Sequence, residues 1–451
     1  MESLESFVGA LNGILWGPIM LVVLVGTGIF FSIRTRFVQV RRFGAAMKRV
    51  FGGFSLQGAK AGKDGMSSFQ ALTTAIAAQV GTGNIAGCAT AIVSGGPGAI
   101  FWMWLSAFFG MSTIYAEAVL AQKTKTRDED GHVIGGPAYY IRAAFSGAFG
   151  KFLAGFFSVA IILALGFMGN MVQSNSISEA FSTAFGAPKA VMGVICALIA
   201  GFIFIGGLSR IASFTEKVVP IMAILYIIGS LILIIIHIGN LPGAIASIFI
   251  GAFSPQALGG AAIGLTVKAA VRFGIARGLF SNEAGMGSTP HAHALARVEH
   301  PAEQGETAMV GVFIDTFVVL NMTALVILTS GVYEPLGDLT GTSLAQKAFE
   351  SGFGTFGNMF VAVCLLFFAF SSIIGWYFFG KQNVTDLFGA RAVMPYSIIV
   401  VICILIGSML KVTLVWDMSD MFNGLMVIPN LIGVLALNGI VAAEARHFDK
   451  K

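Results

Sequence analysis

Long stretches with few or no charged residues are the feature that most constrains how this chain can fold. A helix needs about 20 residues to cross the roughly 30 Å hydrocarbon layer of a bilayer. About eleven stretches meet this requirement, so we predict an all-α polytopic membrane protein. They cover residues 15–33, 69–93, 98–121, 152–185, 191–208, 218–238, 262–285, 308–332, 357–380, 394–410 and 422–442.

The composition supports this prediction and excludes a soluble chain. Of the 451 residues 56% are hydrophobic and only 11% are charged, with a mean hydropathy of +0.85. Soluble domains carry about 25% charged residues, because their surfaces face water. The four cysteines, Cys88, Cys196, Cys364 and Cys403, all lie within apolar stretches, which indicates buried side chains rather than a disulfide framework.

The basic residues predict the orientation of the chain in the membrane. They gather in every second loop, at 34–63, 123–127, 210–217, 297, 381–391 and 446, whereas 239–260 contains no Lys or Arg. Loops rich in Lys and Arg face the cytoplasm. We therefore expect a protein of the cytoplasmic membrane with its N-terminus outside and its C-terminus inside. This alternation also argues against nucleic acid as the partner of a chain with net charge +5.

Two of the predicted spans contain residues that a lipid-facing helix avoids. The second is interrupted at residues 81–84 (GTGN) and the seventh at residues 281–288 (SNEAGMGS). Unwound backbone at membrane depth is tolerated only where it lines a cavity or binds a ligand. The chain thus divides into an extra helix and loop (1–66) and two five-helix units (67–238 and 262–442) inside one domain, 1–451. An odd number of spans inverts the second unit, and paired broken helices indicate a transporter with a site at mid-membrane.

The first break, QVGTGNIAG at residues 79–87, is the strongest single motif. As a dinucleotide-binding loop it would need a preceding strand and a later acidic residue, and it has neither. Glycines alone could serve helix packing, but packing does not explain Thr82 and Asn84 beside them. The end of a half-helix near Val80 exposes carbonyls to a cation, and the start of the next near Asn84 exposes amides to a carboxylate.

Acidic residues inside the later spans leave several roles open. Glu283, next to Asn282 at the second break, could bind a substrate ammonium, carry a proton or cap a half-helix. Arg277 precedes Glu283 in the same span, and either Glu283 or a substrate carboxylate could be its partner. Asp315 falls near the bilayer centre, where it could act as a sodium ligand, a proton carrier or a hydrogen-bonding residue.

Polar side chains in two further spans complete the candidate site. Ser371 and Ser372 are adjacent in an apolar span; each hydroxyl could bond back to its own helix, and together the two offer a hard cation neutral oxygens. Trp376, one turn later, is large enough to wall a small pocket, or is a buried tryptophan of the lipid belt. Asn170 and Gln173 share a helix face and are either interhelical contacts or readers of a substrate's polar ends.

Five motifs in order, QVGTGNIAG, SGGPGAIFWMW, GGPAYYI, RGLFSNEAGMGS and FSSIIGWYFFG, together resemble the alanine or glycine:cation symporter family of the amino acid/polyamine/organocation superfamily. The resemblance covers nearly the whole chain. It implies a LeuT-like fold of two inverted five-helix repeats with one extra N-terminal helix. It also implies sodium-coupled uptake of alanine or glycine by alternating access.

The resemblance assigns roles to particular residues. It implies that the pocket floor consists of Gln79, Gly81, Thr82, Gly83 and Asn84. Gln173 and Trp376 become its walls. The sodium site it implies comprises the carbonyls of Ala77, Val80 and Phe368 and the hydroxyls of Ser371 and Ser372. Gln79 is longer than the residue common at this place, so glutamine and serine stay open as substrates.

Other functions are weighed against this one. A proton-coupled transporter would use Asp315 or Glu283. A channel or an intramembrane enzyme belongs to a different class, and the sequence offers no nucleophile and base, or metal-ligand pair, at a shared depth for chemistry. We expect a small amino acid, Na+ and membrane lipid as partners, with no obligatory protein partner.

Overall fold

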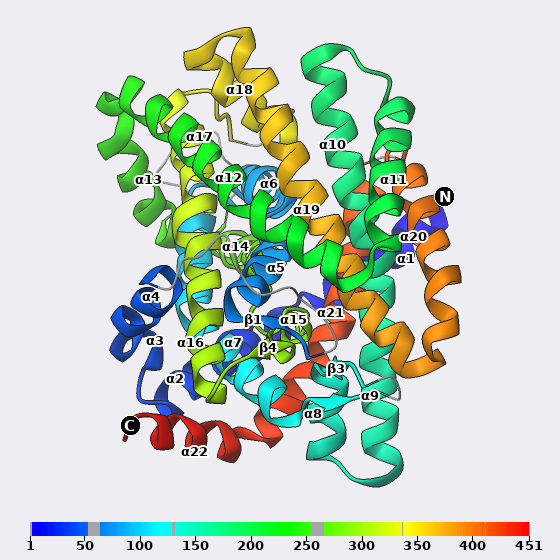
Figure 1. Cartoon of the computed structure of the whole chain (residues 1–451). Helices are drawn as coiled ribbons and strands as arrows, with labels where there is room; N and C mark the ends of the chain where they lie inside the picture. Colours follow the sequence, from blue (N-terminus) through cyan, green and yellow to red (C-terminus); the bar gives the residue numbers. More distant parts are fainter. Residues whose placement is uncertain are drawn as a thin grey trace.

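The computed structural model describes residues 2–52, 64–128, 131–254, 266–335, 337–410 and 412–450, and in these ranges the chain is almost entirely helical (Figure 1). Seven of the described helices are long and apolar enough to cross a membrane, or nine if each of two bent pairs counts as one span. An all-α polytopic membrane protein is therefore confirmed. The number of about eleven spans stays a prediction.

The long membrane helices follow the predicted stretches closely. Three of them contain or begin with a segment of different helical pitch, namely η2, η5 and η6. They are α7 (Gly98–Thr124), α9–η2–α10 (Gly147–Ile161, Ile162–Gly169, Asn170–Phe185), α12 (Gly207–Ile236), α16–η5–α17 (Pro301–Val312, Phe313–Leu320, Asn321–Ser330), α19 (Thr355–Phe388), η6–α20 (Ala390–Ala392, Val393–Gly407) and α21 (Val412–Ala436).

The shorter helices depart from the prediction in several places. The segments Leu241–Phe253 and Gly341–Phe353 were expected to be connections, but they form the helices α13 and α18. Both are helical because each buries apolar side chains along one face. The last predicted span, 422–442, was wrong in its bounds. α21 ends at Ala436, and a separate helix, α22 (Asn438–Phe448), follows. The predicted span 191–208 is α11 (Lys189–Ile205).

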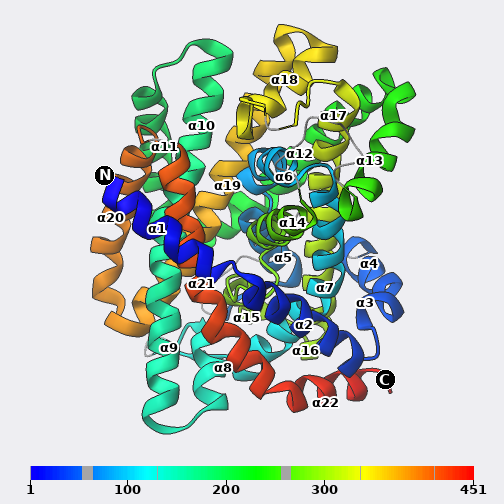
Figure 2. The same cartoon turned by 180° about the vertical axis from the view of Figure 1, so that it is seen from behind.

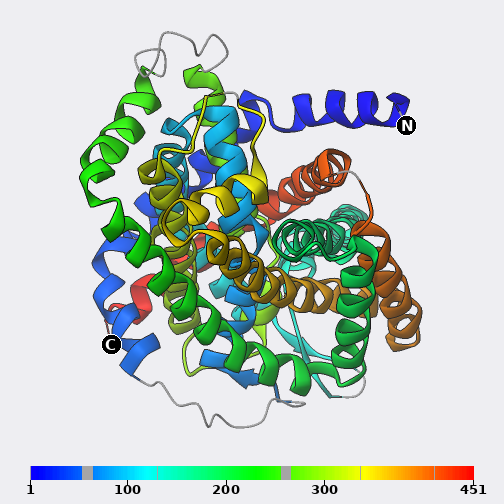
Figure 3. The same ribbon diagram turned by 90° about the horizontal axis from the view of Figure 1, so that it is seen from above.

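The N-terminal segment forms two helices instead of one. α1 (Glu2–Leu15) and α2 (Pro18–Arg34) meet at an angle of 44°. The turn between them contains Gly17, and Pro18 starts α2 at a position where a missing amide hydrogen costs nothing. α1 lies against α21 (Figure 2) and projects beyond the bundle when the molecule is seen from above (Figure 3).

Two broken helices occupy the middle of the bundle. The first is α5 (Ser68–Gln79) followed by η1 (Gly83–Gly87) and α6 (Cys88–Gly95), and the second is α14 (Val267–Asn282) followed by α15 (Pro290–Ala294). Long helices surround them, among them α7, α10, α16 and α19 (Figure 1). Strand β1 (Met66–Ser67) pairs with β4 (Ala296–Arg297), and β2 (Thr126–Arg127) with β3 (Val133–Ile134).

Arginine ion pairs gather at one end of the bundle. α18 lies at one end, and α8 (Pro137–Ala144) and the C-terminal helix α22 lie at the other (Figure 1). At the α22 end, helices α3 (Val38–Arg41) and α4 (Phe43–Gly52) contribute arginines that pair with acids. The ion pairs there are Arg41–Asp449, Arg42–Glu306, Arg49–Glu303, Arg49–Glu306 and Lys123–Glu444.

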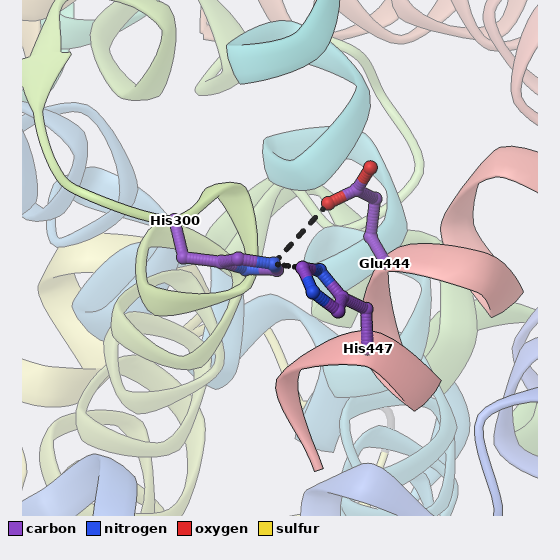
Figure 4. A group of neighbouring side chains, drawn as sticks. All are labelled: His300, Glu444 and His447. Atoms are coloured by element: carbon purple, nitrogen blue, oxygen red, sulfur yellow. Dashed lines mark hydrogen bonds and ion pairs between the residues drawn. The ribbon is translucent and has the colours of Figure 1, made fainter. Parts of the chain in front are cut away.

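A cluster of His300, Glu444 and His447 docks α22 onto the start of α16 (Figure 4). Nε2 of His300 lies 3.3 Å from Nδ1 of His447 and 3.4 Å from a Glu444 oxygen. A metal ion would accept this spacing. However, Nδ1 of His300 accepts the amide hydrogen of Ala302 at 3.1 Å, which places the ring proton of a neutral imidazole on Nε2. Hydrogen bonding to α22 therefore accounts for the cluster.

Candidate functional site

The first break interrupts the helical hydrogen bonds where the glycines predicted it. α5 ends at Gln79, and the axis bends by 48° before η1 continues. The amide of Gly81 donates to Oδ1 of Asn84 (2.9 Å) and the amide of Thr82 donates to Oε1 of Gln173 (3.2 Å). In a continuous helix both amides would bond four residues back. Two amides of the unwound segment are therefore held by polar side chains.

Two carbonyls at the end of α5 meet the paired serines of α19. The hydroxyls of Ser371 and Ser372 each lie 3.3 Å from a carbonyl oxygen, that of Ala77 and that of Ala78 respectively. Both hydroxyls also donate to the carbonyl of Phe368, at 2.9 and 3.1 Å. Five oxygens from two helices thus converge, and they include four of the five predicted sodium ligands.

One detail differs from the predicted sodium site. The serines contact the carbonyl of Ala78, which the sequence did not suggest, whereas the predicted ligand Val80 is buried beside them as the cap residue of α5. Val80 has an extended backbone (φ −80°, ψ 92°), because the chain leaves the helix at this residue.

Gly81 is required because the backbone here touches α19. A Cβ atom on Gly81 would lie 2.2 Å from Oγ of Ser372 and 3.2 Å from Nε2 of Gln173. Real Cβ atoms essentially never approach a neighbour below 3.0 Å. A glycine is therefore what allows the first break to lie against the serine pair.

Four buried polar atoms, two at the first break and two on α10, have no hydrogen-bond partner among the described residues. They are Oε1 of Gln79, Oγ1 of Thr82, Oδ1 of Asn170 and Nε2 of Gln173. Each residue is at most 2% exposed. A buried polar atom without a partner costs about 1–3 kcal/mol, so these four atoms favour a polar ligand. All four belong to residues predicted to bind substrate.

Trp376 is held in one orientation beside these atoms. Its Nε1 donates to a carboxylate oxygen of Glu283 at 2.6 Å, and the ring of Phe280 packs edge-on with centroids 5.7 Å apart. Gly169 lies against the indole, and a Cβ there would be 2.6 Å from the ring. A large side chain fixed on three sides limits the space for a ligand.

The second break is longer and is held by acidic side chains. Glu283 adopts a left-handed conformation (φ 59°), as do Gly285 (95°) and Gly287 (80°). The carboxylate of Glu117, on α7, accepts the amides of Gly285 and Gly287, both at 3.1 Å. Asn430 donates to Glu117 at 2.5 Å and to the carbonyl of Gly285 at 2.9 Å. The unwound backbone is therefore satisfied by the protein.

Of the roles left open for Glu283, the contacts indicate a structural one in this conformation. Its backbone caps α14, and its carboxylate accepts hydrogen bonds from Ser288 and from Trp376. Arg277 pairs with Asp420 at 2.8 Å, not with Glu283.

Asp315 connects the two breaks from η5. Its carboxylate accepts Nδ2 of Asn84 at 2.6 Å and the hydroxyl of Ser281 at 3.0 and 3.1 Å. The hydroxyl of Thr316 donates to it at 2.9 Å, and Asn282 donates to Thr316 at 3.1 Å. Both breaks are thus tied to one buried acid, in a cluster rich in hard oxygen atoms.

The two breaks also touch each other directly. A Cβ on Gly83 would lie 3.0 Å from Cα of Ser281, and the side-chain Nε2 of Gln79 donates to the carbonyl of Asn282 at 2.7 Å. Segments 200 residues apart therefore form one site. Local distortions surround it, since η1, η2 and η5 are all π-helical, a form that is frequent at functional sites.

Two acids beside the breaks have no basic partner among the described residues. Glu283 and Asp315 are each fully buried, and neither of them takes part in an ion pair. A charge at membrane depth is costly unless it is paired or bound to a cation. The arrangement therefore favours a site that takes up a cation.

Sequence reasoning missed Glu117 and Asn430. Glu117 lies four residues from the end of the predicted span 98–121, a position typical of the membrane interface. An acid inside a predicted span was the available signal. Asn430 carried the same kind of signal, as a polar residue inside the span 422–442.

The comparisons with known proteins agree on one family. A model of the sodium:alanine symporter family matches residues 1–451. The sodium/alanine symporter AgcS of Methanococcus maripaludis is 42% identical over 99% of this chain and 97% of its own length. The probable sodium/glutamine symporter GlnT of Bacillus subtilis is 40% identical over 100% of this chain and 92% of its own length.

Solved structures show the fold. MhsT in complex with L-phenylalanine aligns with a TM-score of 0.58 at 14% identity, covering 84% of this chain and 95% of that chain. A manganese transporter of Eremococcus coleocola aligns with a TM-score of 0.53 at 18% identity, covering 82% and 76%. The LeuT-like fold is therefore confirmed.

Proposed function

The chain belongs to the sodium:alanine symporter family, and we propose that it imports a small neutral amino acid, alanine or glycine, together with Na+ across the cytoplasmic membrane. The family and its relatives are transporters rather than enzymes. The observation that carries the proposal is the set of four unpartnered polar atoms, on Gln79 and Thr82 at the unwound helix and on Asn170 and Gln173 of α10, whose Gln173 bonds to that helix.

The substrate's two charges fit the two sides of this break. The start of η1 carries the partial positive charge of a helix N-terminus, which favours a carboxylate. The side-chain oxygens of Gln79, Thr82 and Asn170 are acceptors for an ammonium group. Trp376, fixed by Glu283, closes the space beside them and favours a small side chain.

Sodium binds, in this proposal, where α5 meets α19. The ligands are the carbonyls of Ala77, Val80 and Phe368 and the hydroxyls of Ser371 and Ser372. Neutral oxygens suit a hard cation, and carbonyls at a helix end carry partial negative charge. The buried carboxylate of Asp315 adds negative charge close to both breaks, together with Asn282 and Glu283.

Transport proceeds by alternating access between two inverted repeats, 67–238 and 262–442, with 1–66 as an added helix and loop. The α18 end faces outward and the arginine-rich α22 end faces the cytoplasm, as the positive-inside rule requires. Sodium drives import if its binding raises the affinity for the amino acid, and this coupling is reciprocal.

Uptake of radiolabelled alanine into proteoliposomes tests the proposal. We expect uptake under an inward sodium gradient, and none under lithium or proton gradients alone. A control with Ser397→Ala, on α20 outside the site, should transport like the unmodified protein. Equal uptake in the absence of sodium would reject the coupling.

Two alternatives are outcomes of the same assay. Uptake that follows a proton gradient and is lost in Asp315→Asn would assign the coupling to protons. If glutamine inhibits alanine uptake as strongly as unlabelled alanine does, the substrate would include glutamine, the amino acid named for the 40% identical relative GlnT. The long side chain of Gln79 is the reason to test glutamine.

A further inference from the structure

An open cavity of about 520 Å³ lies where the C-terminal helix α22 meets the end of α2. Its lining residues are Arg36, Ala443, Arg446, His447, Asp449 and Lys450. Figure 2 shows α22 and the end of α2 side by side, and Nε of Arg34 donates to Oδ1 of Asn438 at 3.2 Å across this contact. The cavity therefore belongs to the arginine-rich α22 end of the bundle and not to the breaks in its middle.

One arginine outside the lining ties the two walls of the cavity together. Nη1 of Arg41 donates to a carboxylate oxygen of Asp449 at 2.7 Å, and its Nε donates to the carbonyl of Arg36 at 3.4 Å. The turn that contains Arg36 has a left-handed backbone (φ 58°), and the amide of Arg36 donates to the carbonyl of Ile33 at 3.1 Å. The shape of the cavity is therefore set by hydrogen bonds within the protein.

The charge of this cavity is positive and is not neutralised by the protein. Arg36, Arg446 and Lys450 are exposed, and none of them forms an ion pair with another described residue. Asp449 is the one acid of the lining, and it is already paired with Arg41. Three cations from two helices thus face a shared space without an anionic partner.

A small side chain leaves room between the cations of α22. Ala443, Arg446 and Lys450 are spaced i, i+3 and i+7, which places them on one face of the helix, and all three are exposed. The other face is buried against the bundle through Val441 and Ala442. Because position 443 carries only a methyl group, the charged face is hollow at its centre.

The cavity adjoins a surface that faces lipid. α2 is part of a candidate membrane span and ends at Arg34, two residues before Arg36. The last turns of α2 expose large apolar side chains, among them Phe30 and Ile33, the latter 64% exposed, and Phe37 is exposed just after them. Basic residues at the end of a span lie at the depth of the lipid head groups. The cavity therefore has cations at that depth and an apolar surface beside them.

We propose that this cavity binds the head group of an anionic phospholipid. Its phosphate lies against Arg36, Arg446 and Lys450, and its acyl chains lie along the exposed face of α2. Basic pockets beside membrane helices are suited to anionic head groups, and the attraction adds up over the basic residues. A free phosphate would use the same cations but not the apolar surface. The site requires neither substrate nor sodium, so it is independent of the proposed transport function.

Native mass spectrometry of the purified full chain tests this site. The chain is titrated with phosphatidylglycerol or with phosphatidylcholine of the same acyl chains, and phosphatidylglycerol should bind at least about tenfold more tightly. Removal of three cations, by Arg36→Gln, Arg446→Gln and Lys450→Gln together, should weaken phosphatidylglycerol binding about hundredfold. All three side chains are exposed, so the melting temperature without added lipid should stay the same.

Two further variants separate the cavity from positive charge in general. Lys151→Gln, Lys217→Gln and Arg391→Gln together remove three exposed cations outside the cavity, and this variant should bind phosphatidylglycerol like the unmodified chain. Ala443→Leu keeps every charge but fills the hollow, so phosphatidylglycerol should bind about tenfold more weakly. Equal loss in the two triple variants, or unchanged binding in Ala443→Leu, would overturn the site.

A gain of affinity provides a test that misfolding cannot imitate. Asp449→Asn removes the one acid of the lining and releases Arg41, so phosphatidylglycerol should bind about fivefold more tightly. Glycerol phosphate carries the phosphate without acyl chains and should bind far more weakly than the lipid. Equal binding of glycerol phosphate would assign the cavity to a free phosphate ester and overturn the lipid site, as would equal affinity for the two lipids or weaker binding in Asp449→Asn.

Discussion

Both breaks bond their unwound backbone to polar side chains, but they differ in how many polar side-chain atoms nearby are left without a partner. At the first, the chain leaves the helix at Val80 and resumes it at Gly83, and unpartnered polar atoms surround the gap. At the second, Glu117 and Asn430 satisfy the exposed backbone of Gly285 and Gly287. Unwound backbone at membrane depth therefore does not identify a binding site by itself. Polar side-chain atoms without hydrogen-bond partners beside the unwound backbone are the better indication of a binding site.

The largest expected effect is at the first break. Gly81→Ala places a Cβ 2.2 Å from Oγ of Ser372, and because forced overpacking costs about 1–3 kcal/mol, we expect uptake to fall about hundredfold. Initial rates of alanine uptake in proteoliposomes measure this. Gly87→Ala, where the nearest atoms lie at 3.8 Å, is the control and should retain normal uptake. Unchanged uptake in Gly81→Ala would contradict the close contact.

Glu117→Gln tests whether the second break is held in place by its acid. The carboxylate of Glu117 accepts hydrogen bonds from the backbone N–H groups of Gly285 and Gly287. In the glutamine variant an NH₂ group replaces one carboxylate oxygen, so one of these N–H groups loses its acceptor. An unsatisfied buried group costs about 1–3 kcal/mol, which predicts a lower melting temperature and about tenfold slower uptake. The sodium concentration for half-maximal uptake should stay the same. A large change in that concentration would instead assign Glu117 to ion binding.

Ser372→Ala separates ion binding from structure at the first break. Removing one proposed sodium ligand should raise the sodium concentration for half-maximal uptake about tenfold, since bonds to charged groups contribute about 1.5–3 kcal/mol. The maximal rate at saturating sodium should change little. Titration of uptake with sodium checks this, and Ser330→Ala at the end of α17 is a matched control. An unshifted titration would remove Ser372 from the sodium site.

The smallest effect is expected where the breaks meet. Gln79→Ala removes the bond to the carbonyl of Asn282 and leaves space beside Gly311. We expect the preference between glutamine and alanine to shift about threefold toward glutamine, as small changes of pocket volume contribute about 1 kcal/mol. Competition assays with both amino acids measure the ratio. A shift toward alanine would indicate that Gln79 faces away from the substrate side chain.

The spans and both breaks could be predicted from the sequence because their physical causes are local. Lipid excludes charge over about 20 residues, and glycine next to Thr82 and Asn84 is unfavourable inside a lipid-facing helix. The bounds of α21 and the existence of α13 and α18 could not be predicted in the same way. The hydrophobicity of these segments is compatible with a membrane span, a shorter helix or a connection. Packing against other helices decides which of these forms.

The sequence by itself determined that this chain crosses a membrane, where its helices break and which family it resembles. Only the tertiary structure decided that Asp315 ties both breaks together, that Arg277 pairs with Asp420 and that Glu117 holds the second break. Hydrophobicity and missing Cβ atoms act within one segment, so a sequence records them directly. Hydrogen-bond partners more than 100 residues apart are chosen by packing, and no local pattern records that choice.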